Sequence, residues 1–128
     1  MDTWKISGGE SLFGSVRIPS AKNSVLPLMA ASLLCSGTVT LTDVPNLSDV
    51  MASRRILQSL GCKVRWKGRT LSITPGQQIG STVPEEYMRA MRSSVFYLAP
   101  LLVRTGKALI YTPGGCRLGA RPIDLHLK

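Results

Sequence analysis

The residues best suited to chemistry lie in a glycine-rich segment near the end of the sequence, Thr112-Pro-Gly-Gly-Cys-Arg-Leu-Gly-Ala-Arg-Pro122. This segment places one thiol, Cys116, directly before Arg117 and five residues before Arg121, and neighbouring cations raise the thiolate fraction of a cysteine. Pro122 is suited to the first position of a helix, whose free N–H groups attract a phosphate. A tight turn with an incidental cysteine is the alternative. The glycines and arginines favour an exposed, reactive thiol.

Two further basic positions are candidates for binding an anion. Lys22 stands in Ser20-Ala-Lys-Asn23, at the expected start of a helix, where unpaired N–H groups and the helix dipole draw negative charge. Arg92 follows Arg89 by about one helical turn and lies beside an apolar stripe, so it is not expected on the fully exposed face. An arginine at the edge of a core usually pairs with an acid or binds an anion. At both positions a solvated surface side chain is the alternative.

The charge of the chain also indicates an anionic partner. Among 128 residues, 16 Lys and Arg stand against 7 Asp and Glu, which gives a formal net charge of +9. Such an excess attracts nucleic acid, a membrane surface or a small phosphorylated ligand. The hydrophobic content of 44% is that of a folded globular protein rather than a disordered chain.

The apolar segments and cysteines predict the cellular setting. The longest apolar run, Val25–Cys35, has 11 residues, whereas a membrane-spanning helix needs about 20, so no membrane partner is expected. The sequence opens without the features of a signal peptide. Cys35, Cys62 and Cys116 lack CxxC spacing, which favours reduced thiols in a cytoplasmic protein, with Cys35 and Cys62 buried. With a single histidine, no metal site is expected.

Hydrophobic periodicity predicts one βαβαββ unit over about residues 15–75, hence an α/β fold. Residues 15–19 alternate as a short strand, and Asn23 or Ser24 can cap the helix that follows. Pro27 is then acceptable in the first helical turn. The remaining elements are a strand over 38–42, a helix over 48–61, and a hairpin of 62–66 with 70–74.

The same order of elements starts again at about residue 80 and continues to 128. Aligning Ala21 with Ala90 also aligns Gly37 with Gly106. The second unit is expected to open with a helix from Pro84 whose apolar stripe runs to Leu102, kinked near its end by Pro100. A strand over 107–111 and a helix from 121 should follow. Because a repeat needs neighbours to cover its apolar face, a longer parent protein is expected.

Four motifs carry a resemblance to a known family. They are Gly-x-Val-x-Ile-x-Ser-Ala-Lys-Asn with Leu-Pro-Leu, Val-Pro-x-Leu-x-Asp, Met-Arg-x-Ser, and Pro-Gly-Gly-Cys-x-x-Gly-Ala-Arg-Pro-x-Asp-Leu-His. In this order they closely resemble the UDP-N-acetylglucosamine 1-carboxyvinyltransferases, which begin bacterial peptidoglycan synthesis in the cytoplasm. The resemblance implies transfer of the enolpyruvyl group of phosphoenolpyruvate to the 3′-hydroxyl of UDP-N-acetylglucosamine, with release of phosphate.

The resemblance also implies a role for each candidate residue. Cys116 would donate a proton to the enol carbon, form a covalent phosphoenolpyruvate adduct and react with fosfomycin-type inhibitors. Lys22 and Asn23 would bind phosphoenolpyruvate. No metal or cofactor is implied. The residues implied to contact the UDP-sugar or the phosphate are Arg92, Arg121, Pro122, Ile123, Asp124 and Leu125.

For the fold, the resemblance implies repeated βαβαββ units of an inside-out α/β barrel, incomplete here. Family members have two domains of three such units each, with the active site in the cleft between them. Residues 1–20, with a strand near Trp4, would join the second domain, and 21–128 would be part of the first. The aspartate base and a further arginine would lie outside this chain. The 128-residue chain alone is therefore expected to be inactive and to self-associate through its uncovered apolar face.

Two other functions remain as alternatives. The sibling 5-enolpyruvylshikimate-3-phosphate synthases typically have serine where this chain has Asn23, and they lack the cysteine segment. A basic nucleic-acid-binding βαβαββ module would suit the charge, but Trp66 and Tyr97 lie in core-like patterns rather than among the surface lysines and arginines. We therefore expect no nucleic-acid partner. A truncated product without activity is a third possibility.

Overall fold

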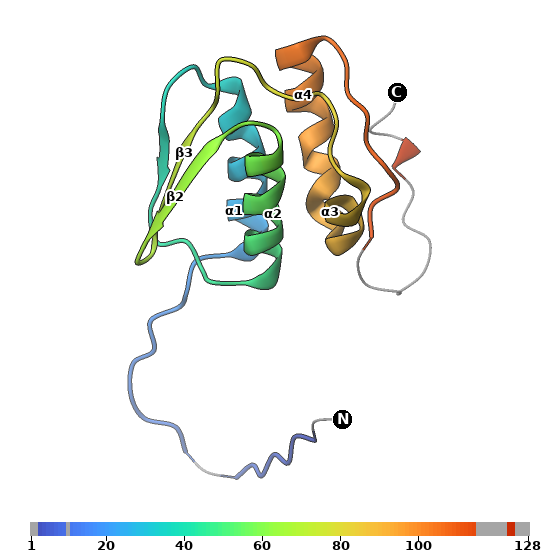
Figure 1. Cartoon of the computed structure of the whole chain (residues 1–128). Coiled ribbons are helices and arrows are strands. Elements are labelled where there is room, and N and C mark those ends of the chain that lie inside the picture. Colours follow the sequence, from blue (N-terminus) through green and yellow to red (C-terminus); the bar gives the residue numbers. More distant parts are fainter. Residues whose placement is uncertain (1–2, 10, 115–122, 125–128) are drawn as a thin grey trace.

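The computed structural model describes residues 3–9, 11–114 and 123–124. Its elements form layers: a small sheet, two helices packed on one face of it, and a further helical layer beyond them (Figure 1). No helix in the described ranges has the length and apolar character needed to cross a membrane. The elements are α1 (Lys22–Ala31), η1 (Ser32–Leu34), β1 (Val39–Leu41), α2 (Ser48–Ser59), β2 (Lys63–Lys67), β3 (Thr70–Thr74), α3 (Glu85–Ala90), η2 (Arg92–Tyr97) and α4 (Leu98–Thr105).

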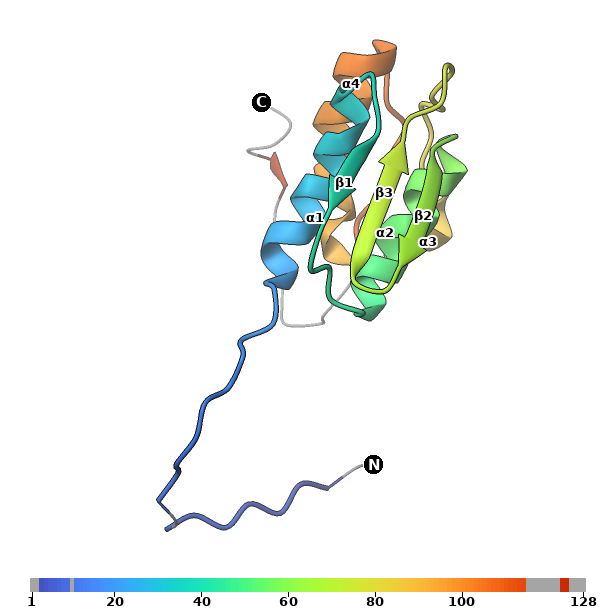
Figure 2. The ribbon, with the colours of Figure 1, turned by 90° about the vertical axis from the view of Figure 1, so that its left-hand side faces the viewer.

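The sheet is antiparallel, in the order β1-β3-β2. Figure 2 shows β3 between its two neighbours, with the helices behind. Alternate residues of β3, Leu71 and Ile73, are fully buried against the helices, as the period of two along a strand requires. The hairpin and the strand over 38–42 are thereby confirmed. The tight turn uses Gly68 at φ 59°, a conformation that favours glycine, and the Trp66 indole N–H donates to its carbonyl at 2.7 Å.

The two helices on the sheet differ in how well the sequence predicted them. α2 begins at Ser48, as expected, and has Asp49 in its first turn, where an acid favours the helix dipole. α1 begins at Lys22 after an N-cap of Ala21, so neither Asn23 nor Ser24 is the cap. Pro27 consequently lies in the second turn rather than the first. In the second turn a backbone N–H normally donates within the helix, and proline, which has no N–H, leaves that hydrogen bond unformed.

Three expected strands are wrong: those near Trp4, over 15–19 and over 107–111. Residues 3–9 and 11–19 have no helix or strand, and Val16 and Ile18 are 88% and 84% exposed. A strand exists only when another strand pairs with it, and the described residues offer none to 15–19. The strand expected over 107–111 is reduced to one parallel bridge, between Leu109 and Thr82. The first unit therefore reads αβαββ.

The helix expected from Pro84 to Leu102 is interrupted. Its backbone becomes extended at Met91 (φ −150°, ψ 147°), between α3 and η2. The break is not at Pro100, which lies in the first turn of α4, where its missing N–H costs nothing. As a result the predicted stripe is only partly internal: Met88 and Met91 are buried, whereas Leu102 is 46% exposed.

A buried polar contact joins the two helical layers. The Tyr97 hydroxyl lies 2.6 Å from the Ser53 hydroxyl and donates to the Ser53 carbonyl at 3.1 Å. Burial raises the pKa of Tyr97 well above its usual range, so the phenol stays protonated. This contact connects η2 to α2.

Tyr97→Phe should lower the free energy of unfolding by about 1–3 kcal/mol, because it removes a buried hydrogen-bond partner and leaves the Ser53 hydroxyl unsatisfied. Urea denaturation of the 128-residue chain measures the change. Tyr111→Phe is the matched control, because Tyr111 is 38% exposed. Equal effects of the two substitutions would show that the contact contributes nothing.

Candidate functional site

The structure places Lys22 at the adjoining N-termini of α1 and α2. The Lys22 ammonium contacts the Asp49 carboxylate at 2.5 Å, from the first turn of one helix to the first turn of the other. The lysine side chain is 46% exposed, so an anion in solvent can reach it, while the aspartate is 21% exposed. Asn23 is next to Lys22 and is also exposed. Lys22 therefore forms an ion pair with Asp49 and stays accessible to solvent, and its binding of an anion remains a prediction.

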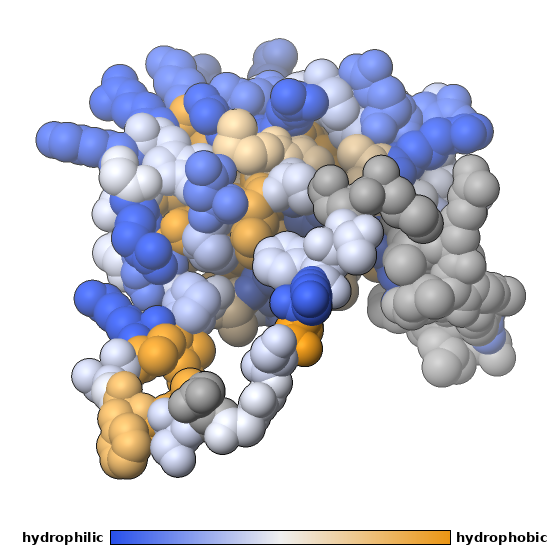
Figure 3. Space-filling model, turned by 90° about the horizontal axis from the view of Figure 1, so that it is seen from below, coloured by the Kyte–Doolittle hydropathy of each residue, from blue (hydrophilic) through white to orange (hydrophobic). Residues whose placement is uncertain are grey.

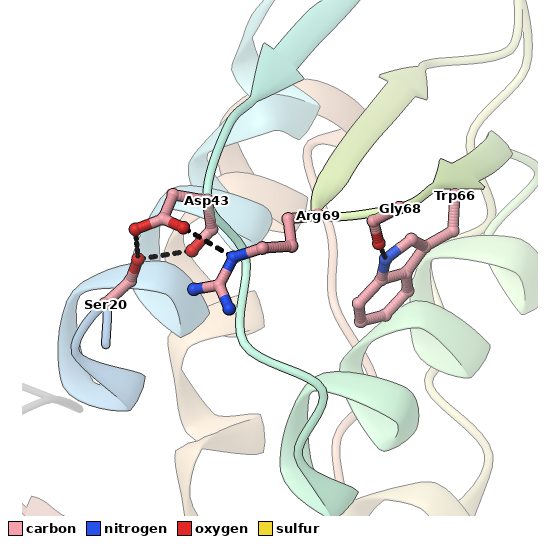
Figure 4. Close-up of polar contacts among 5 residues, drawn as sticks. All are labelled: Ser20, Asp43, Trp66, Gly68 and Arg69. Carbon is pink, nitrogen blue, oxygen red and sulfur yellow. Dashed lines mark hydrogen bonds and ion pairs between the residues drawn. The ribbon is translucent and has the colours of Figure 1, made fainter. Parts of the chain in front are cut away.

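A polar junction lies directly before this helix (Figure 4). The Ser20 hydroxyl donates to the Asp43 carboxylate at 2.6 Å and also contacts the Asp43 carbonyl. From the other side, the Arg69 Nε–H donates to the same carboxylate at 2.5 Å. The hydrogen bonds from Ser20 and Arg69 lower the pKa of Asp43 below its usual value. The junction joins the start of α1, the end of β1 and the β2–β3 turn.

The lowered pKa of Asp43 predicts an acid-sensitive contribution to stability. The folded state prefers the ionised carboxylate, so the contribution is complete above the unfolded-state pKa of about 4 and is lost as the pH falls through the folded-state pKa. Urea denaturation of wild type and Asp43→Asn from pH 7 to pH 3 should show two free energies of unfolding that converge at the acid end. A constant difference across this range would contradict the prediction.

Arg89 and Arg92 differ in their surroundings. Arg89 forms an ion pair with Glu85 one turn earlier on α3, at 2.5 Å. Arg92 opens η2 and is exposed, so the expectation that it avoids the exposed face is wrong. The interruption of the helix at Met91 is the reason, since it turns the following residues out of the α3 register. Because η2 packs against α1, the elements that carry Arg92 and Lys22 are neighbours.

The start of the cysteine segment is held against the broken helix. The Gly114 N–H donates to the Met88 carbonyl at 3.0 Å, and the Ser94 hydroxyl donates to the same oxygen at 3.1 Å. A Cβ on Gly114 would overlap the backbone carbonyl of Arg89. Only glycine fits this close approach, two residues before Cys116.

Several predicted site residues lie outside the described residues: Cys116, Arg117, Arg121, Pro122 and Leu125. Ile123 is partly buried and Asp124 is exposed. The structure therefore brings Lys22 and the element of Arg92 together and leaves the association of the cysteine segment with them as a prediction.

The two other cysteines differ from each other. Cys62 is buried as expected, and burial raises the pKa of its thiol. Cys35 is exposed, so its expected burial is wrong: η1 ends at Leu34 and the backbone is extended at Cys35. Within the described ranges, no group of three His, Cys, Asp or Glu could hold a metal ion.

Three contacts of this region were not anticipated from the sequence: Lys22 with Asp49, Asp43 with Ser20 and Arg69, and Gly114 with α3. The Lys22–Asp49 contact could have been predicted from the sequence, because an acid in the first turn of one helix can face a lysine in the first turn of its neighbour. The other two join residues far apart in the chain, and residue type alone does not reveal them.

Known proteins with a similar sequence cover the chain from end to end. The UDP-N-acetylglucosamine 1-carboxyvinyltransferase 2 of Carboxydothermus hydrogenoformans is 46% identical over 129 residues, which are 100% of this chain and 30% of that protein. The UDP-N-acetylglucosamine 1-carboxyvinyltransferase of Desulfosudis oleivorans is 43% identical over 128 residues, again 100% of this chain and 31% of that protein. The chain thus spans about a third of the length of these curated relatives.

Fold and family comparisons agree with the sequence relatives. The solved structure of the enolpyruvyl transferase NikO from Streptomyces tendae superposes with a TM-score of 0.68 at 23% identity, covering 77% of this chain and 23% of that one. This likeness confirms the α/β enolpyruvyl transferase fold. The family model for EPSP synthase (3-phosphoshikimate 1-carboxyvinyltransferase) matches residues 6–128. Since the match extends over almost the whole sequence, the chain belongs to the EPSP synthase family.

Proposed function

We propose that this chain is part of a cytoplasmic enolpyruvyl transferase that acts on phosphoenolpyruvate and UDP-N-acetylglucosamine in peptidoglycan synthesis. The observation that carries the proposal is the 2.5 Å Lys22–Asp49 pair at two adjoining helix N-termini, which presents a half-exposed ammonium where anions are favoured. The names of the relatives at 43% and 46% identity support the choice of UDP-N-acetylglucosamine as the acceptor. Residues 21–128 belong to one domain in this proposal, and 1–20 join another.

The proposed reaction assigns distinct roles to the candidate residues. Lys22 and Asn23 bind phosphoenolpyruvate. The 3′-hydroxyl of the sugar adds to C2 of phosphoenolpyruvate and gives its proton to the base outside this chain, while Cys116 protonates C3. Loss of phosphate from C2 and of a C3 proton, which regenerates the Cys116 thiol, then restores the double bond. The thiol is also the site of a covalent adduct and of fosfomycin-type inhibitors. The UDP-sugar contacts are assigned to Arg92, Arg121, Pro122, Ile123, Asp124 and Leu125.

Turnover can be tested in a chimera in which residues 1–128 replace the matching segment of the Desulfosudis oleivorans relative, hereafter the chimera. Phosphate release from phosphoenolpyruvate should require UDP-N-acetylglucosamine. Release with shikimate 3-phosphate instead would favour the second candidate, the reaction named in the family description. Release with neither acceptor would contradict the proposal. The 128-residue chain alone is the negative control, because one wall of an interdomain cleft cannot exclude water or orient two substrates.

Self-association of the 128-residue chain is part of the same proposal, but the most exposed large apolar residues lie in the N-terminal segment rather than on the face of the repeat. Figure 3 views the molecule from below and shows apolar side chains open on this face. Six large apolar residues of the N-terminal segment are more than 80% exposed, and exposed apolar surface of this kind favours association. They are Trp4, Ile6, Leu12, Phe13, Val16 and Ile18.

Cys116 should be the first of the three thiols to react with iodoacetamide, followed by Cys35 and then by the buried Cys62. The reason is the glycine-rich segment around Cys116, in which Arg117 and Arg121 follow the thiol. Peptide mapping by mass spectrometry after limited alkylation gives the order. Because Cys35 is exposed, its rate is the internal control for simple accessibility: labelling of Cys35 ahead of Cys116 would show that the segment does not activate the thiol.

A further inference from the structure

The junction of Ser20, Asp43 and Arg69 holds the segment that presents Lys22. Ser20 lies two residues before Lys22, and its hydroxyl donates to the Asp43 carboxylate at 2.6 Å. Asp43 in turn is held by Arg69 at 2.5 Å. Figure 4 shows the Asp43 side chain between the other two, with Ser20 at the beginning of α1 and Arg69 beside the hairpin turn.

The beginning of α1 depends on this contact because the helix has no side-chain cap. Its N-cap is Ala21, which offers no side-chain acceptor, and the first N–H groups that reach the Ala21 carbonyl, from Ser24 and Val25, do so at 3.2 and 3.3 Å. Those distances are at or beyond the long end of the range for N–H···O bonds. The Ser20–Asp43 hydrogen bond therefore joins the residues before the helix to the sheet layer.

Asp43 is itself held in an unusual backbone conformation. Its φ of 57° lies in the left-handed region, which aspartate and asparagine tolerate better than most residues do. The neighbouring Val44 N–H donates to the Arg69 carbonyl at 2.8 Å, so the backbone and the side chain of Arg69 both fix this turn. A conformation of this kind persists only where surrounding contacts determine it.

We propose that Asp43 is a positioning residue for Lys22: bridged by Arg69, it fixes Ser20 and thereby keeps the Lys22 ammonium against Asp49. The importance of this for turnover rests on the proposed function, in which Lys22 binds phosphoenolpyruvate. The position of Lys22 itself does not rest on it. Loss of the Ser20 or Asp43 partner lets the first turn of α1 move, and the Lys22–Asp49 pair then opens more often.

The test measures acetylation of Lys22 in the 128-residue chain, mapped by mass spectrometry and divided by the rate at exposed Lys63. Ser20→Ala and Asp43→Asn should each raise this ratio about two- to tenfold, the range that one net hydrogen bond represents in an equilibrium. Ser20→Thr keeps a hydroxyl and should restore the wild-type ratio. Thr38→Ala is the matched control, because it removes a similar hydroxyl pair with Thr74, 2.7 Å long, at the opposite end of β1.

Two outcomes would overturn the proposal: an unchanged ratio in folded Ser20→Ala, or an equal rise in Thr38→Ala. Circular dichroism establishes folding, and Ser20→Ala alone decides the matter if Asp43→Asn does not fold. In the chimera, Ser20→Ala should raise KM for phosphoenolpyruvate more than it lowers kcat. If the acetylation ratio rises while Lys22→Ala leaves the chimera fully active, the proposed function fails and the positioning of Lys22 by Asp43 stands.

Discussion

Lys22→Ala should lower phosphate release by the chimera about a hundred- to a thousandfold, the usual cost of removing one group that stabilises developing charge in an active site. The expectation follows from the position of the ammonium at two helix N-termini, half exposed and already beside one carboxylate. Without it, the N–H groups and the dipoles of the helices remain, but the positive charge that Lys22 brings to the phosphate is lost. Steady-state phosphate release at saturating phosphoenolpyruvate gives the loss in kcat.

Two companion variants separate a local effect from a general one. Lys63→Ala removes an exposed lysine from β2 and should leave turnover unchanged. Lys22→Arg keeps the charge but changes the geometry, because a planar guanidinium replaces a compact ammonium, and it should retain more activity than Lys22→Ala. Wild-type turnover in Lys22→Ala would remove this lysine from the site.

Gly114→Ala should cost about 3 kcal/mol, because a methyl group at this position overlaps the Arg89 carbonyl and forces the backbone away from α3. Overpacking of this kind costs about 1–3 kcal/mol, and the hydrogen bond to the Met88 carbonyl, worth about 1 kcal/mol, is lost with it. Urea denaturation reports the total. Faster hydrogen exchange at the amide of residue 114 reports the local displacement.

Gly37→Ala is the control for this substitution. A Cβ at Gly37 meets nothing within 4 Å and its φ is not in the left-handed region, so alanine should be accepted there without loss. If both alanine variants unfold at the same urea concentration, the close approach of Gly114 to α3 is of no energetic importance.

The sheet and α2 were predictable because their signals are local. Val64, Leu71 and Ile73 alternate with polar residues, and a Lys-Gly turn separates the two strands, so the hairpin follows from its own residues. The strand expected over 15–19 has a similar alternation but lacks a partner strand. Pairing is a property of two segments, and the pattern of one segment does not supply it.

The break at Met91 shows a different limit. The residues from Pro84 to Leu102 keep a helical period, which predicts one long helix. At the break, the Ser94 hydroxyl donates to the Met88 and Met91 carbonyls within the same segment, and the Gly114 N–H donates to the Met88 carbonyl from farther along the chain. None of these hydrogen bonds can be predicted from the spacing of hydrophobic residues.

The candidate site was likewise predictable only where the evidence for a residue is local. Lys22 at a helix start follows from residue type and position. The Ser20–Asp43–Arg69 junction does not, since its members are separated by 23 and 26 positions and lie before α1, after β1 and in the β2–β3 turn. Contacts between polar side chains that are far apart in the sequence can be identified only once the fold is known.

The buried Met88 carbonyl accepts two donors at once, the Gly114 N–H at 3.0 Å and the Ser94 hydroxyl at 3.1 Å. A doubly bonded carbonyl has a weakened C=O bond and absorbs infrared light at a lower frequency than its neighbours. A ¹³C label on that single carbonyl would therefore give the protein its own vibrational reporter. Because one of the two donors, Gly114, belongs to the cysteine segment, the frequency of this band would report whether the Gly114–Met88 hydrogen bond is formed, on a timescale faster than any alkylation or exchange experiment.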